Sequence, residues 1–162
     1  MKSLKLFGEI NEEMVRSVAE YLEDAQGKPV QVLLHSLGGE SYSAMAISEL
    51  FTEYPGLITI NAIGTVQSAA VLVLAYGDSR YISKSSWVMV HEDSDDSPIM
   101  NTSYARTYSK HMKDCEIQWA KLLAKVTKET PKKWYQMHKK TTYLTAEQAI
   151  KLGLADFYLE DK

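Results

Sequence analysis

The chain has 162 residues and a formal net charge of −3, from 18 basic and 21 acidic side chains. Its length is enough for one sizeable core and short for two, so we expect a single domain over residues 1–162. The balanced charge argues against a nucleic-acid surface and against a polybasic membrane patch, which leaves proteins or peptides as the expected partners.

Strand and helix patterns alternate along the first 91 residues. Helices are predicted after Asn11, after Gly39 and after Ser68, and the last of these is apolar on all sides, as expected for a helix inside the fold. Asn11 is the expected cap of the first helix, because two acidic residues follow it where the helix dipole favours negative charge. The alternation implies βαβ crossovers and therefore an α/β fold with a mainly parallel sheet. The predicted strands span residues 4–7, 30–34, 57–63, 80–82 and 87–91.

Three of these strand ends carry residues suited to nucleophilic chemistry. Ser68 opens a helix, where a serine can be exposed as a nucleophile beside unpaired helical N–H groups. Gly38 and Gly39 break another strand, and a turn without side chains can aim an N–H at an acyl oxygen. His91 ends a third strand, at the sheet edge where functional groups gather in open α/β folds. Helix capping is the alternative role of Ser68, but the three together predict a nucleophile, an oxyanion turn and a base.

The second half of the chain is predicted to be mostly helical. Residues 92–98 are acidic and turn-rich, which predicts a solvated loop. The longest helix follows, and its apolar stripe is open to two interpretations, packing in the core or contact with a neighbouring subunit. Cys115 on this stripe is expected to be a small buried hydrophobic residue. Shorter helices are predicted from Pro131 and from a capping box at 145–148, the latter ended by Gly153. The stripe consists of Tyr104, Tyr108, Met112, Cys115, Trp119, Leu122 and Val126.

Several short motifs follow one another in a characteristic order along nearly the whole chain. They are Gly8-Glu-Ile, His35-Ser-Leu-Gly-Gly, Gly64 to Ala70, Val88-Met-Val-His91, Tyr143-Leu-Thr-Ala-Glu-Gln-Ala and Gly153-Leu-Ala-Asp156. In this order they resemble the proteolytic subunit of the Clp protease, the ClpP family, and its phage and prophage relatives. The resemblance implies a crotonase-like βαβ superhelix whose long helix belongs to a handle that joins two rings.

The resemblance also implies a role for individual residues. Ser68 is the nucleophile and His91 the general base; the oxyanion donors are the backbone N–H groups of Gly39 and Ala69, and Gly38, Gln67 and Ala70 belong to the substrate-binding wall.

The acid of the family's triad has no counterpart in this chain, because Thr141 stands at its position, two residues before Tyr143. A threonine hydroxyl can accept an imidazole N–H but has no charge with which to stabilise imidazolium, so we expect slow or conditional catalysis. The alternative is a substitute carboxylate from another subunit or from Glu92, Asp93, Asp95 or Asp96.

The predicted function is that of a serine-type endopeptidase, which cleaves peptides or unfolded proteins inside a homo-oligomeric ring or stacked rings. Two alternatives stay open: an inactive ClpP-like scaffold subunit, and a crotonase-like enzyme that acts on acyl-CoA. No metal or cofactor is expected, because the histidines and the cysteine do not follow a metal-ligand pattern. The chain begins almost at its first strand, so docking of an ATP-dependent unfoldase is an open alternative and not an expectation.

The predicted location is the cytoplasm. No apolar run reaches the roughly 20 residues of a membrane span, and the first residues contain too short an apolar stretch for a secretory signal. Cys115 is the only cysteine, which excludes an intrachain disulfide and fits a reducing compartment.

Overall fold

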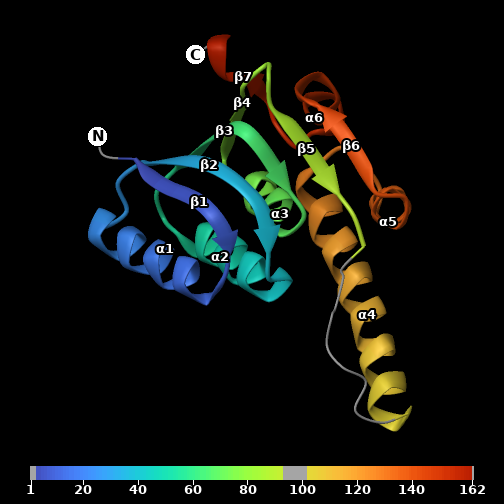
Figure 1. Ribbon diagram of the computed structural model, residues 1–162. Coiled ribbons are helices and arrows are strands. Elements are labelled where there is room, and N and C mark those ends of the chain that lie inside the picture. Colours follow the sequence, from blue (N-terminus) through green and yellow to red (C-terminus); the bar gives the residue numbers. More distant parts are fainter. Residues whose placement is uncertain (1–2, 93–101, 162) are drawn as a thin grey trace.

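The computed structural model describes residues 3–92 and 102–161 and has the expected α/β architecture (Figure 1). The strands are β1 (Leu4–Ile10), β2 (Val30–Gly39), β3 (Ile58–Gln67), β4 (Ser79–Ile82), β5 (Trp87–Val90), β6 (Thr142–Thr145) and β7 (Phe157–Tyr158). The helices are α1 (Glu12–Ala25), α2 (Ser41–Glu53), α3 (Ala69–Ala75), α4 (Thr102–Val126), α5 (Pro131–Lys139) and α6 (Ala146–Leu152), and a 3-10 turn follows at Leu159–Asp161.

The sheet is mainly parallel, with the strand order β1-β2-β3-β4-β7. β3 changes neighbours along its length, because residues 59–62 pair with β4 whereas residues 65–67 pair with β5. β5 pairs in turn with β6, and this pair is antiparallel. The change of neighbour places the end of β5 beside the end of β3, so residues that directly follow these two strands come close together.

Helices α1, α2 and α3 lie against one face of the sheet (Figure 1). All seven residues of α3 are buried, as its apolar sequence predicts. The helices α1 and α2 each bury one face, which contributes Val18 and Leu22 from α1 and Ile47 and Phe51 from α2 to the core. Removal of these apolar faces from water is the main favourable contribution to folding.

The predicted helix caps are present. The Asn11 side chain accepts a hydrogen bond of 3.0 Å from the Met14 N–H at the start of α1. Thr145 and Gln148 form the capping box of α6, and Gly153 ends that helix in a left-handed conformation. These caps satisfy backbone groups that a helix end otherwise leaves unpaired.

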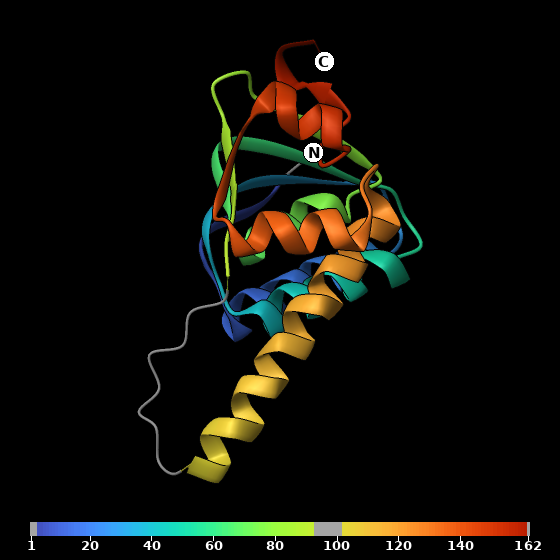
Figure 2. The same ribbon diagram turned by 90° about the vertical axis from the view of Figure 1, so that its right-hand side faces the viewer.

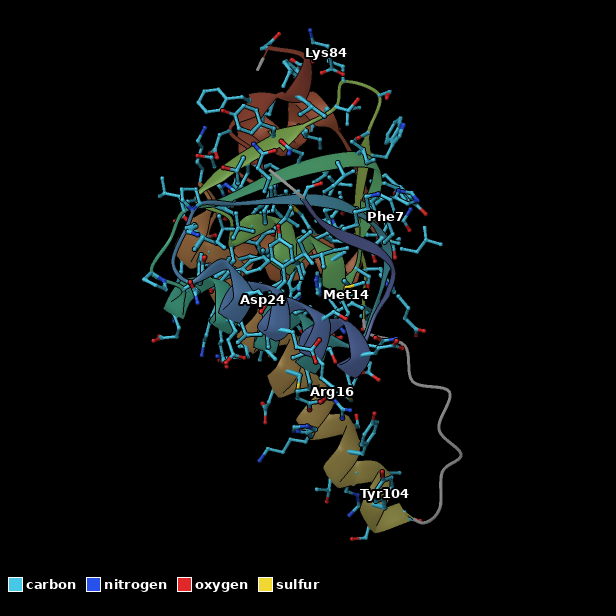
Figure 3. All side chains as sticks on the ribbon, turned by 90° about the vertical axis from the view of Figure 1, so that its left-hand side faces the viewer. Phe7, Met14, Arg16, Asp24, Lys84 and Tyr104 are labelled. Carbon is cyan, nitrogen blue, oxygen red and sulfur yellow. The ribbon has the colours of Figure 1, made fainter. Side chains whose placement is uncertain are left out.

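Helix α4 has two parts with different surroundings (Figure 2). Its C-terminal half packs in the core through Trp119, Ala120 and Leu123. Its N-terminal half extends away from the sheet and the other helices, and Figure 3 shows Tyr104 near the far end. The core interpretation of the apolar stripe is therefore confirmed for the C-terminal half, whereas the interface interpretation of the N-terminal half stays a prediction.

The structure departs from the predicted elements at several strands. β1, β2 and β3 continue past their predicted ends, to Ile10, Gly39 and Gln67, through irregular pairing. β6 and β7 are too short, at four and two residues, to leave a periodic pattern in the sequence. Of the acidic segment 92–98, only Glu92 is among the described residues.

Within residues 3–92 and 102–161, no helix has both the length and the apolar character that crossing a membrane requires.

Candidate active site

Ser68 and His91 lie at the ends of neighbouring strands. Ser68 directly follows β3, and His91 directly follows β5. The distance between His91 Nε2 and Ser68 Oγ is 2.9 Å, which is within hydrogen-bonding range. An imidazole nitrogen at this position can accept the hydroxyl proton, as nucleophilic attack by a serine requires.

The backbone of Ser68 has a conformation that residues other than glycine rarely adopt. Its φ of 53° and ψ of −128° belong to a sharp turn from strand to helix, of the kind that exposes a nucleophile. The Ser68 N–H donates to the Met89 carbonyl over 2.7 Å, and the Ser68 carbonyl accepts from the Val71 N–H over 3.0 Å. Strain of this kind persists where the surroundings hold it, as these two hydrogen bonds do. The Ser68 side chain makes no capping hydrogen bond to α3, so the capping interpretation is wrong.

Gly38 and Gly39 are the last two residues of β2 and pair with Glu9 and Ile10 of β1, so the predicted break of the strand at these glycines is wrong. They lie beside the serine, and we call these two residues the glycine turn. Gly38 has a φ of 106°, and a Cβ added to it would lie 2.6 Å from the Ser68 Cβ. A Cβ added to Gly39 would lie 2.2 Å from the Ile10 carbonyl oxygen. Neither distance is possible for a real side chain, so the turn requires glycine at both positions. Bare backbone therefore approaches the nucleophile.

A pocket of about 390 Å³ contains the Ser68 and His91 side chains. Its lining also includes Gly39 from the turn, and Tyr108 and Met112 from α4. A pocket of this size admits part of a peptide, and small-molecule and peptide sites have volumes in this range. The chain thus builds its candidate site between the strand ends and the long helix.

Three other residues that the resemblance assigns to the site lie around the serine. Ala69 is the first residue of α3, where a backbone N–H has no partner within its helix. The Gln67 side chain donates to the Thr65 Oγ1 atom over 2.8 Å. Ala70 is fully buried in the core, so the expectation that its side chain shapes the substrate-binding wall is wrong. It supports α3 from the inside, because α3 is buried on all sides.

Thr141 directly precedes β6 and His91 directly follows β5, so the two residues lie at the same end of this antiparallel strand pair. Thr142 pairs with Val90, so the next residues in this antiparallel register are Thr141 and His91. Thr141 is exposed, has a φ of 46°, and donates its N–H to the His138 carbonyl over 3.2 Å. In the part of the chain that the structure describes, no hydrogen bond joins Thr141 to His91. The expected support of the base by a threonine hydroxyl is absent from this arrangement.

The proposed substitute carboxylates do not fill this gap within the described residues. The Glu92 carboxylate forms an ion pair with Lys139 Nζ, which also lies 3.3 Å from the buried Glu116 carboxylate. Glu92 is therefore directed to a lysine and not to the adjacent imidazole. Asp93, Asp95 and Asp96 lie outside the described residues.

A second histidine, His138, is buried close enough to His91 for their charges to interact. His138, on α5, is 3% exposed, and its ring centroid is 3.9 Å from that of Trp119. Burial, and to a smaller extent charge repulsion from the His91 imidazole, together lower the pKa of His138 to about 4. His138 is therefore neutral at neutral pH. The sequence placed His138 on a helix but carried no signal of its burial.

A cluster at the pocket was not predicted from the sequence. The Tyr42 hydroxyl hydrogen-bonds to His111 Nε2 and lies 3.2 Å from Cys115 Sγ, and Nε2 is 3.6 Å from Sγ. Cys115 is half-buried and has polar neighbours, so the expectation of a buried hydrophobic residue is wrong. The spacing of four between His111 and Cys115 indicates one helix face, but the sequence separation of 69 between Tyr42 and His111 hides the third member.

Among residues 3–92 and 102–161, no group of three or more histidine, cysteine, aspartate or glutamate side chains has an arrangement that could hold a metal ion. His35 lies at the irregular pairing of β2 and β3, where its Nδ1 atom is 3.3 Å from both the Ile63 carbonyl oxygen and the Thr65 backbone nitrogen. The imidazole of His35 therefore has a structural environment outside the pocket.

Comparison with known proteins gives one family and one fold. A family profile described as Clp protease matches residues 2–162. The chain is 25% identical over 165 residues to the ATP-dependent Clp protease proteolytic subunit 2 of Pseudomonas aeruginosa, and the match covers 96% of this chain and 81% of that protein. Among solved structures, a ClpP1 mutant from Listeria monocytogenes has a similar fold, with a TM-score of 0.86 and 17% sequence identity over 97% of this chain and 90% of that one.

Proposed function

Because the chain belongs to the Clp protease family, we propose that it is a serine endopeptidase with Ser68 as nucleophile and His91 as general base. The observation that carries this proposal is the 2.9 Å contact between Ser68 Oγ and His91 Nε2. The strained backbone of Ser68 and the pocket beside it support the same assignment. The proposed substrates are peptides or unfolded proteins, which are cleaved inside a chamber formed by several copies of the chain.

The proposed reaction begins with attack of Ser68 Oγ on the carbonyl carbon of the scissile bond, while His91 Nε2 takes the hydroxyl proton. The backbone N–H groups of Gly39 and Ala69 stabilise the negative charge on the carbonyl oxygen. His91 then donates its proton to the leaving amine as the C–N bond breaks, which leaves an ester on Ser68. Water, deprotonated by His91, hydrolyses this ester and restores the serine.

The missing carboxylate sets the expected speed of this reaction. An acid beside the base orients the imidazole and stabilises its charged form. Thr141 is exposed, and Glu92 is paired with Lys139, so neither supplies this charge to His91. The proposed enzyme is therefore slower than a serine peptidase with a complete triad.

A fluorophosphonate probe tests the nucleophile, because it forms a covalent adduct with an activated serine. Mass spectrometry of the intact protein should find one adduct, and peptide mapping should place it on Ser68. The Ser68→Ala variant should not be labelled. His91→Ala should lower the labelling rate by at least about a thousandfold, since the hydroxyl loses its proton acceptor.

His35→Ala is the matched control for His91→Ala. His35 is also a histidine at a strand of the same sheet, but its imidazole contacts the backbone at Ile63 and Thr65 and does not reach Ser68. The labelling rate of the His35→Ala variant should stay within about threefold of that of the unchanged protein. A Ser68 that stays unlabelled in every oligomeric state of a folded sample would contradict the proposed activity.

The absence of a carboxylate at His91 among the described residues favours a second candidate, an inactive scaffold subunit. Such a subunit would assemble with normal stability but would not react with the probe. Thermal shift with coenzyme A addresses the acyl-CoA alternative, for which the peptidase proposal predicts no stabilisation.

The N-terminal half of α4 supports the proposed assembly. It extends beyond the rest of the chain and carries the exposed Tyr104, whose ring stacks on Tyr108 at 5.7 Å. In an assembly, this half of the helix would bury its aromatic side chains against another copy. Light scattering after gel filtration should give a multiple of the 18.3 kDa chain mass, and Tyr104→Asp should reduce that multiple. A monomer at all concentrations would exclude the chamber.

A further inference from the structure

Strands β1 and β2 pair irregularly beside the active-site turn. Phe7 pairs with His35, and the next pair is Glu9 with Gly38. β2 therefore holds one residue more than β1 between these pairs, which is a β-bulge. A bulge leaves backbone groups that cannot pair across the two strands, and buried groups of this kind need another partner.

Ser36 lies in this bulge and supplies that partner. Its side chain is buried, with 1% of the residue exposed. The Ser36 Oγ atom donates to the Gly8 carbonyl over 2.6 Å and accepts from the Gly38 N–H over 3.0 Å. One hydroxyl thus satisfies one backbone acceptor on β1 and one backbone donor in the turn. We infer that Ser36 is a positioning residue that holds the glycine turn in place for the oxyanion step; this role rests on the proposed peptidase function.

The contact of Gly38 with the nucleophile connects this hydroxyl to the reaction. A Cβ on Gly38 would lie 2.6 Å from the Ser68 Cβ and 2.9 Å from the Gln67 carbonyl oxygen, so only a residue without a side chain fits at this place beside the serine. The next residue, Gly39, carries one of the two proposed oxyanion donors. Such a donor is effective only when it lies about 2.7–3.1 Å from the position of the oxyanion. Without the Ser36 hydroxyl the glycine turn can shift, and the Gly39 N–H then loses its alignment with the oxyanion position.

Ser36→Ala tests the inference in the full chain, with a fluorogenic peptide as substrate. We expect kcat to fall about tenfold to a hundredfold while KM changes less than about twofold, because the turn acts on the transition state and not on ground-state binding. The affinity for a peptide boronate, which forms a tetrahedral adduct with the serine, should fall by the same factor as kcat. Ser36→Thr retains the hydroxyl and should recover kcat to within about threefold of the unchanged protein.

Ser48→Ala is the matched control. Ser48 is also 1% exposed, and its hydroxyl donates to the Ala44 carbonyl over 2.8 Å within α2. This variant removes a buried hydroxyl of equal size and should lower the melting temperature to a similar extent, but it should leave kcat unchanged. Equal kcat values for Ser36→Ala and Ser48→Ala would overturn the inference, as would a loss in Ser36→Ala that appears only in KM.

Amide hydrogen exchange gives a readout that does not depend on catalysis. Exchange at Gly38, measured by NMR, should be at least about tenfold faster in Ser36→Ala than in the unchanged protein or in Ser48→Ala, because the amide loses its acceptor. Unchanged exchange would overturn the inference even if the chain had no peptidase activity. An unlabelled Ser68 together with fast Gly38 exchange in Ser36→Ala would instead refute the proposed function, but it would still show that the Ser36 hydroxyl holds the glycine turn.

Discussion

Ser68 and His91 are hydrogen-bonding neighbours, but the structure constrains the serine much more tightly than the histidine. Backbone hydrogen bonds to Met89 and Val71 hold Ser68, and Gly38 lies against its Cβ. His91 follows a strand of four residues. Within residues 3–92 and 102–161, no hydrogen bond or ion pair connects the His91 imidazole to a carboxylate.

This contrast separates two requirements of serine catalysis. The nucleophile needs a defined geometry, which close backbone packing provides. The base needs stabilisation of its charged form, which a neighbouring negative charge provides. Changes to the residues that pack around the serine should therefore slow the reaction strongly, whereas changes to the residues around the histidine should adjust its rate moderately or alter the pH range in which the protein is stable.

Gly38→Ala alters the tightly packed side and should have the largest effect among variants that leave the Ser68 and His91 side chains in place. The new methyl group would lie 2.6 Å from the Ser68 Cβ, and the residue would need a φ of 106°. The turn or the serine must then shift, and displacement of a reacting group by about 1 Å can cost a hundredfold in rate. We expect the rate of fluorophosphonate labelling to fall at least about a hundredfold.

Gly27→Ala distinguishes the contact from backbone strain. Gly27 also has a positive φ, of 78°, but a Cβ added there would meet only the Pro55 Cγ atom, at an ordinary contact distance of 3.4 Å. The variant should lose about 1–2 kcal/mol in the free energy of unfolding and keep its labelling rate within about threefold. Equal losses of labelling in the two variants would show that strain, and not the approach to Ser68, is the cause.

His138→Met tests the surroundings of the base through the pH dependence of the free energy of unfolding. The pKa of His138 falls from 6.5 to about 4 in the folded protein because of burial and the nearby His91 charge. Between these pH values the unfolded chain binds a proton that the folded chain excludes, so this contribution to stability is present above pH 6.5 and is lost as the pH falls toward 4. The loss should amount to roughly 3 kcal/mol. Urea denaturation at pH 7 and pH 4 should show a smaller decrease for the variant, whereas an equal decrease would place the titration elsewhere.

Thr141→Asp should produce the smallest change and the only gain. The residue stands next to the Thr142–Val90 pair, so its position is opposite His91 in the register. An aspartate there would supply the missing charge, and we expect peptide turnover to rise about tenfold. A turnover that stays equal or falls would refute the view that the missing carboxylate limits the rate.

Thr141→Asn is the control for a backbone effect of that substitution. Thr141 has a φ of 46°, which is unfavourable for a β-branched residue and easier for asparagine or aspartate. The asparagine variant should gain stability similar to that of the aspartate variant but no comparable turnover. If both variants gain turnover equally, relief of strain is the cause and charge is not.

Much of the fold could be predicted because the relevant signals are local. Asn11 caps a helix through a residue three positions away, and Thr145 and Gln148 do the same for α6. The positions of Ser68 and His91 at strand ends were likewise visible in the sequence. The roles of Ser36, Tyr42 and His138 were not visible, because their contacts join segments that are distant in the chain.

By itself, the sequence determined the order of the first five strands and of the helices, the helix caps, the apolar character of α3 and the pair of glycines beside the nucleophile, because these properties depend on residues a few positions apart. Only the tertiary structure decided that β3 leaves β4 for β5, which brings the hydroxyl at the end of one strand to the imidazole at the end of the other. It also decided that the residue at the acid position faces solvent and that Glu92 pairs with a lysine. These outcomes depend on how the whole sheet bends and packs, which no short stretch of sequence specifies.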